Sequence, residues 1–138
     1  TNEILKRFKK ISKNFDNIFL IISLSTNIIS KKKIENILKD LPKDITVIFV
    51  HPHPTLEVFL NDKKFDKFNK EKNDYFLVLK NFKTKYNLLI FDPYEHLCQN
   101  NNCNSNKYKD FFTDIGHFKL STSKYLSSKF LDFLKFNW

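Results

Sequence analysis

Three short apolar runs stand out along the chain, at residues 17–23, 45–50 and 87–91. Each contains four or five consecutive large apolar side chains. A run of this length without polar alternation is typical of a strand that is covered on both faces, as in a parallel sheet. The pattern therefore predicts three buried strands, and the second one ends at the His-Pro-His-Pro segment 51–54.

Segments with helical spacing lie before, between and after these runs. Residues 2–13 and 30–40 place apolar side chains three and four positions apart, and so does a last segment that begins at about Thr122. Ser30 is suited to cap the second of these helices, and Pro42 ends it. The apolar positions that would face inward are Ile4, Leu5, Phe8, Ile11, Ile34, Ile37, Leu38, Leu41, Leu126, Phe130, Phe133 and Leu134.

The middle of the chain is harder to assign. Residues 56–72 are polar and irregular, and we expect a loop with a helical turn there. Asn73 or Asp74 is placed to cap a helix that runs to Tyr86. The β-favouring residues 75–78 make a strand the competing interpretation of the same segment.

The order of these elements alternates helix and strand, which predicts the α/β class. We expect a three-layer sandwich with a parallel sheet and right-handed crossovers, formed by a single domain over residues 1–138. In such sheets, functional side chains gather beyond the carboxyl ends of the strands. Here those segments are residues 23–28, residues 51–54 and a long loop expected over residues 92–117.

The chain carries a formal net charge of +9, from 24 basic and 15 acidic residues. Only Arg7 among the basic residues is an arginine, the side chain best suited to bidentate contacts with phosphates and bases. The lysines are scattered and suit solvated helix surfaces. We therefore do not expect nucleic acid as a partner, while weak attraction to an anionic polysaccharide or a membrane surface stays open.

No apolar run approaches the roughly twenty residues of a membrane-spanning helix, and no signal peptide is visible. The chain contains no methionine and opens directly in a segment with helical spacing. We therefore interpret it as a fragment of a longer protein.

Cys98 and Cys103 are separated by four polar residues. A disulfide across this short loop would contribute about 2 kcal/mol to stability and would imply an oxidising compartment. Two free thiols in a reducing compartment are one alternative. Metal ligation together with His96 is another, although the spacing matches no common zinc pattern. We expect neither a cofactor nor a metal.

Asp114 and His117 are the one place where a carboxylate that can orient an imidazole stands beside it in the sequence. A histidine that accepts a proton from a serine needs its other ring nitrogen held by an acceptor, which a nearby carboxylate supplies. The alternative is an aspartate that caps a turn beside a half-buried histidine. No serine nucleophile motif accompanies the pair, so the sequence contains half of an active site.

His51 and His53 alternate with prolines after the second predicted strand. They can be interpreted as an i, i+2 metal pair or as residues that face the site. An extended turn imposed by the two prolines is the simpler interpretation. Asp92 and Pro93 similarly mark the end of a strand and the start of a turn.

The last third of the chain contains several short motifs in a fixed order. They are Asp-Pro at 92–93, Leu-Cys at 97–98, Cys103, Tyr108, Asp-x-x-His at 114–117 and Ser-Lys-Tyr-Leu at 123–126. This series resembles the end of the SGNH hydrolase-like domain that is fused to acyltransferase-3 membrane proteins. These bacterial enzymes O-acylate cell-surface polysaccharides such as lipopolysaccharide O-antigen. The resemblance covers most of the chain and is specific over residues 91–126.

The resemblance implies an SGNH, flavodoxin-like fold whose first strand precedes the chain. His117 would be the general base that activates a serine, and Asp114 would orient it. The serine would lie upstream in a Gly-Asp-Ser motif. Cys98 and Cys103 would form a disulfide that holds the loop before the Asp-x-x-His motif.

Asn27 is the candidate for the asparagine of the family's oxyanion hole, with a solvated or helix-capping role as the alternative. Ser23 and Ser25 lack the flanking glycine that exposes a nucleophile, and we expect structural hydroxyls. The chain departs from the family at Thr122, where a glycine is usual. It departs again at residues 118–119, Phe-Lys, where Leu-Ser is usual.

The expected function is therefore a part in a bacterial O-acyltransferase that acts on surface polysaccharide at the periplasmic face of the inner membrane. Its partners would be an acyl donor, a sugar acceptor and a membrane acyltransferase-3 domain of the same parent chain. This chain alone would be inactive, because a base without a nucleophile forms no acyl intermediate. The alternatives are a non-catalytic basic α/β module that binds a polyanion, and a stand-alone carbohydrate esterase.

Overall fold

The computed structural model describes residues 3, 6, 7, 10, 11, 13, 14, 18–23, 31–99 and 103–137. The helix expected over residues 2–13 lies mostly outside them. The elements, in chain order, are β1 (Phe19–Ser23), α2 (Lys31–Lys39), β2 (Thr46–Val50), α3 (Leu56–Phe59), α4 (Asp62–Phe82), β3 (Leu88–Phe91), α5 (Pro93–Leu97), α6 (Ser105–Lys109) and α7 (Leu120–Phe136).

The three apolar runs form a parallel sheet with the strand order β1-β2-β3. Ile48 in the central strand pairs in register with Ile21 on one side and Leu89 on the other. Val47 and Phe49 pack into the same core as α2 and α4, whereas Ile48 points to the opposite face. All three are buried. The parallel pairing of the strands, with helices between them along the chain, confirms both the α/β class and the parallel sheet.

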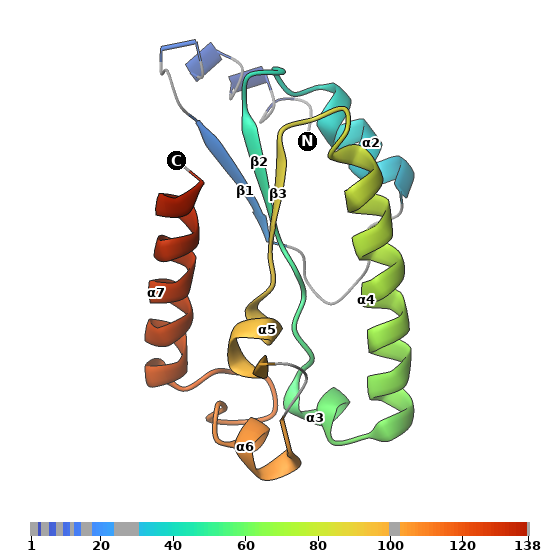
Figure 1. The fold of residues 1–138 in the computed structure, drawn as a ribbon, viewed down its shortest axis with the longest axis vertical. Coiled ribbons are helices and arrows are strands. Elements are labelled where there is room, and N and C mark those ends of the chain that lie inside the picture. Colours follow the sequence, from blue (N-terminus) through green and yellow to red (C-terminus); the bar gives the residue numbers. More distant parts are fainter. Residues whose placement is uncertain are drawn as a thin grey trace.

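Helices lie on both sides of this sheet (Figure 1). On one side, α2 and α4 cover it with the buried side chains Ile34, Leu38, Tyr75, Leu79 and Phe82. On the other side, α7 packs the rings of Phe130 and Phe133 against Phe91, with ring centroids 4.9 and 5.4 Å apart. This arrangement is compatible with the expected three-layer sandwich.

The loop expected over residues 56–72 is wrong, because α3 and most of α4 occupy it. Asn61 starts α4 by accepting the N–H of Lys64 at 3.0 Å, twelve positions before the expected cap at Asn73. The competing strand over residues 75–78 is also wrong. Inward-facing Phe68, Tyr75, Leu79 and Phe82 follow one helical stripe, and Lys70 and Lys80 between them are exposed.

The long loop expected over residues 92–117 contains two short helices. Asp92 starts α5 by accepting the N–H of Tyr94 at 3.0 Å, and Pro93 occupies the first helical position. Asn104 starts α6 by accepting the N–H of Lys107 at 2.9 Å. Both helices begin at a side-chain cap, Asp92 and Asn104.

A second core lies where β2 and β3 end, beside α3, α5 and α6 (Figure 1). Tyr108 of α6 is fully buried there and donates its hydroxyl to the Pro54 carbonyl at 2.6 Å. The disulfide Cys98–Cys103, with Cα atoms 5.1 Å apart, joins the end of α5 to the segment before α6. Across the described part of the chain, no helix combines the length and the apolar character needed to cross a membrane.

A pair of leucine substitutions tests the helical assignment of residues 75–82. A strand would place residues 77 and 79 on the same face, whereas α4 buries Leu79 completely and leaves Leu77 57% exposed. We expect Leu79→Ala to lower the free energy of unfolding by about 2–5 kcal/mol. Leu77→Ala should change it by less than about 0.5 kcal/mol. Urea denaturation measures both, and equal losses would contradict the helix.

Candidate active site

The Asp-x-x-His motif lies in a tight loop between α6 and α7. Phe112 and Phe118 form an antiparallel bridge at the base of this loop. The N–H of Thr113 donates to the His117 carbonyl at 2.8 Å, and the Thr113 hydroxyl donates to the same carbonyl at 3.1 Å. Thr113 therefore closes the loop through the backbone carbonyl of His117, without using the side chains of Asp114 and His117.

Asp114 organises the inside of this loop with one carboxylate oxygen. Its Oδ1 accepts the N–H of Gly116 at 2.8 Å and the N–H of His117 at 2.9 Å. The bond from Gly116 lowers the pKa of Asp114 most, followed by the contact with the His117 side chain and the bond from the His117 N–H. Asp114 is therefore a carboxylate at neutral pH, as an orienting partner must be.

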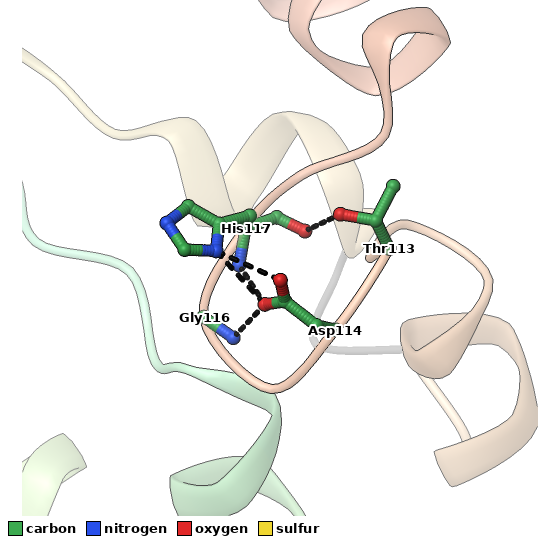
Figure 2. A network of polar contacts seen from close by, with 4 residues as sticks. All are labelled: Thr113, Asp114, Gly116 and His117. Atoms are coloured by element: carbon green, nitrogen blue, oxygen red, sulfur yellow. Dashed lines mark hydrogen bonds and ion pairs between the residues drawn. The ribbon is translucent and has the colours of Figure 1, made fainter.

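The same carboxylate holds the imidazole of His117 (Figure 2). Nδ1 lies 3.0 Å from Oδ1 and 2.9 Å from Oδ2 of Asp114. A neutral ring that donates Nδ1–H to this carboxylate keeps Nε2 as the acceptor, the tautomer that a general base requires. The His117 side chain is 83% exposed, and among the described residues no hydrogen bond reaches its Nε2.

Two contacts attach this loop to the segment that follows β2. The N–H of Leu56 donates to the Ile115 carbonyl at 3.1 Å. The ring of His53 stacks on Phe118, the neighbour of His117, with centroids 4.4 Å apart. The Asp114–His117 pair therefore lies beyond the carboxyl end of the central strand, where parallel sheets place their functional groups.

The surface around the pair is open. A shallow cavity of about 500 Å³ touches Asp114 but does not include His117. A larger one, of about 610 Å³, lies beside α4 and includes neither residue. Neither of these two cavities therefore contains both residues of the candidate site. Asp114 and His117 form the candidate active site because their contact has the geometry of an oriented base, which a cavity alone does not supply.

The other predicted residues divide into three groups. Asn27 and Ser25 lie outside the described residues, and Ser23 is an exposed residue at the end of β1. Cys98 and Cys103 form the disulfide, so neither is a free thiol or a metal ligand in this structure. His96 stacks on Phe91 with centroids 4.9 Å apart.

A buried polar cluster beside α4 was not predicted. Lys72 Nζ lies 2.5 Å from Asp92 Oδ2, and His51 Nδ1 lies 3.8 Å from the same oxygen. Lys72 was missed because its segment was expected to be a loop, and His51 and Asp92 were interpreted as turn residues. One signal was available: both of them directly follow a strand, which places them at the same edge of a parallel sheet.

His51 is 3% exposed, and both its ring nitrogens lack a hydrogen-bond partner among the residues that the structure describes. Burial lowers the pKa of His51 to about 4; the Asp92 carboxylate opposes this shift and the Lys72 ammonium adds to it. Burial also lowers the pKa of His53. Both imidazoles are therefore neutral at pH 7, and no cluster of three metal-ligating side chains is found in the described parts of the chain.

The neutral state of His51 predicts a pH-dependent stability. Between a folded pKa of about 4 and an unfolded value of about 6.5, the unfolded chain binds more protons than the folded one. The free energy of unfolding should therefore fall by about 2 kcal/mol from pH 7 to pH 5. Urea denaturation at both values measures it. His51→Gln should remove much of this slope, and an unchanged slope in that variant would contradict the assignment.

The turn around Asp114 predicts a second titration. The amide signals of Gly116 and His117 should move together as the carboxylate is protonated, because both donate to its Oδ1. The midpoint should lie below the ordinary aspartate value of about 3.9, since the hydrogen bonds stabilise the charged form. Proton–nitrogen spectra measure it, and Asp114→Asn should abolish the transition. A midpoint at or above the ordinary value would refute the turn.

The comparisons with known proteins give this chain no relative. No protein-family model matches it, and neither a curated protein nor a solved structure does. The family resemblance of the motifs therefore stays a prediction, and the candidate site is defined by its own geometry.

Proposed function

We propose that this chain is the His–Asp portion of an SGNH hydrolase-like domain in a bacterial O-acyltransferase for cell-surface polysaccharide. One observation carries the proposal: the Nδ1 atom of His117 rests on Asp114 at 2.9 Å, and its other nitrogen faces solvent. That arrangement is the orienting half of a Ser-His-Asp site. The resemblance of the motifs over residues 91–126 supplies the reaction class.

In the proposed reaction, Nε2 of His117 takes the hydroxyl proton of a serine as the serine oxygen attacks the acyl carbonyl of the donor. The leaving group departs with that proton, and an acyl-serine remains. A sugar hydroxyl then gives its proton to Nε2 and attacks the acyl-serine. The ester bond to serine breaks, Nε2 returns the proton to the serine oxygen, and the sugar carries the acyl group away. Asp114 holds the ring and stabilises the imidazolium formed in both steps.

The open edge of the sheet is consistent with a serine that comes from outside the chain. No described strand pairs with the outer edge of β1, and Ile21 on this strand is 48% exposed, whereas its register partner Ile48 is fully buried. In the flavodoxin-like order 2-1-3-4-5, the last three strands are neighbours and the first strand pairs with the third. β1, β2 and β3 fit those last three strands, so a nucleophile-bearing strand would pair with β1.

The proposed setting follows from the same family. The parent chain would carry a membrane acyltransferase-3 domain, with this domain at the periplasmic face of the inner membrane. The disulfide Cys98–Cys103 suits that oxidising compartment. The acyl donor and the sugar acceptor would meet at His117.

Acetyl-ester hydrolysis by the chain joined to its upstream segment tests the proposal. We expect turnover of 4-nitrophenyl acetate and labelling of one serine by a fluorophosphonate probe. His117→Ala should lower kcat/KM by about 10²–10⁴-fold, because the general base is lost. Asp114→Asn should also lower it, because the wrong tautomer is favoured.

Two matched substitutions serve as controls. His96→Ala and Asp110→Asn remove an imidazole and a carboxylate that contact neither member of the pair, and both should keep the activity of the unmodified protein. Activity of His117→Ala equal to that of the unmodified protein would end the assigned role. Turnover by the 138-residue chain alone would show that the nucleophile is not upstream.

The net charge of +9 favours one second candidate, a non-catalytic module that binds a polyanion. Such a module would bind an acidic glycan or nucleic acid in the 138-residue form, with an affinity that falls steeply as salt is added. An esterase without a membrane partner differs from the leading proposal only in the sequence upstream. Many apolar spans there indicate the acyltransferase, and a signal peptide indicates the secreted esterase.

A further inference from the structure

The larger cavity lies between α4 and the segment where β3 passes into α5, away from the candidate active site. Its volume of about 610 Å³ falls within the range of small-molecule sites, which is about 300–1,000 Å³. Neither Asp114 nor His117 belongs to its lining. Any ligand it holds is therefore bound by groups that the proposed acyl transfer does not use.

One stripe of α4 forms a wall of this cavity. Phe65, Asn69, Lys72 and Phe76 follow each other at intervals of four, three and four residues, which places them on one helical face. Tyr94 of α5 also lines the cavity, and its ring lies 5.0 Å from Lys72 Nζ. Along this wall, the polar side chains of Asn69 and Lys72 therefore lie between the aromatic rings of Phe65 and Phe76.

Several polar side chains of the lining have no hydrogen-bond partner in the described part of the chain. The side chains of Asn69 and Asn73 make no hydrogen bond among the described residues, although each amide offers two donor hydrogens and an acceptor oxygen. His51 also lies in the lining; it is 97% buried and has no partner for either ring nitrogen in the described part of the chain. Asn69 is half-buried and Asn73 is exposed, so water can reach their amides, whereas His51 is enclosed. Buried polar atoms are normally paired, so the two unpaired ring nitrogens of His51 in the lining of this cavity point to a ligand.

The charges of the lining cancel. Lys72 and Lys83 are balanced by Asp92 and Glu95, and Lys72 already pairs with Asp92. A charged ligand would therefore find no unmatched opposite charge here. The Lys72–Asp92 pair instead presents a donor beside an acceptor, which suits groups that donate and accept together, such as hydroxyls.

We propose that this cavity binds a neutral saccharide unit. The C–H face of a sugar ring packs on an aromatic ring such as that of Phe76, which is 43% exposed. The sugar hydroxyls can both donate to and accept from Asn69 and Asn73. The proposal goes beyond the acyl-transfer function and does not depend on it, because no residue of the cavity takes part in that chemistry. Failure of one therefore leaves the other standing.

A titration of the ¹⁵N-labelled 138-residue chain tests the saccharide site. The probes are maltotetraose, chitotetraose and mannotetraose, each up to about 10 mM, and a tetramer of galacturonic acid as the charged comparison. We expect at least one neutral probe to shift the amide signals of residues 69–76 and 92–95 and to leave Gly116 and His117 unmoved. No shift with any neutral probe, or a larger response to the acidic one, overturns the proposal.

Substitutions on the exposed side of the cavity wall locate the binding. Asn73→Ala and Phe76→Ala should each weaken the bound probe roughly fivefold or more. Asn81→Ala and Leu77→Ala are matched controls, because both lie on the same helix outside the cavity lining and should bind as the unmodified chain does. Equal binding by all four variants would place the saccharide elsewhere and would also overturn the proposal. Because Phe76 and Asn73 are exposed, all four should keep the spectrum of a folded protein.

Discussion

The carboxylate of Asp92 joins three elements at the carboxyl end of the sheet. It follows β3 directly, starts α5 by accepting the N–H of Tyr94, and forms an ion pair with Lys72 of α4. Both partners of this pair are nearly buried. Breaking a buried pair by removing one partner leaves the other charge uncompensated, which is far more costly than losing an exposed contact. The angle at which α5 leaves the sheet, and the packing of α4 beside it, therefore depend on one side chain.

Asp92 does not touch the candidate active site; it supports the site indirectly, through α5, the second core and α6. α5 carries Tyr94, Leu97 and Cys98 into the second core, where Tyr108 is held by the Pro54 carbonyl. That core supports the loop of Asp114, which also bonds to the start of α3. The sheet thus fixes α5, α5 and the disulfide fix α6, and α6 presents the loop. These elements support the Asp114–His117 pair, which is exposed, whereas the polar groups of His51, Lys72 and Asp92 are enclosed.

The sequence predicted those features that depend on neighbouring residues. The three strands begin and end within two residues of their apolar runs, because burial on both faces leaves an unmistakable pattern. The contact of Asp114 with His117 was predictable because two residues three positions apart can meet across a single turn. The start of α4 was not predicted, because lysines on its solvent face hide the stripe formed by Phe68, Tyr75 and Leu79. Lys72 could not be paired with Asp92 until that helix was known.

The exposure of His117 constrains what the proposed function requires. Proton transfer from a serine is effective when the site excludes water, and an imidazole that is 83% exposed does not meet this condition alone. The element that brings the serine must therefore also cover His117. A strand added beside β1 would bury Ile21 at the same time, because it extends the sheet over an edge that no described strand occupies. Delivery of the nucleophile, enclosure of the base and completion of the sheet would then be consequences of a single added segment.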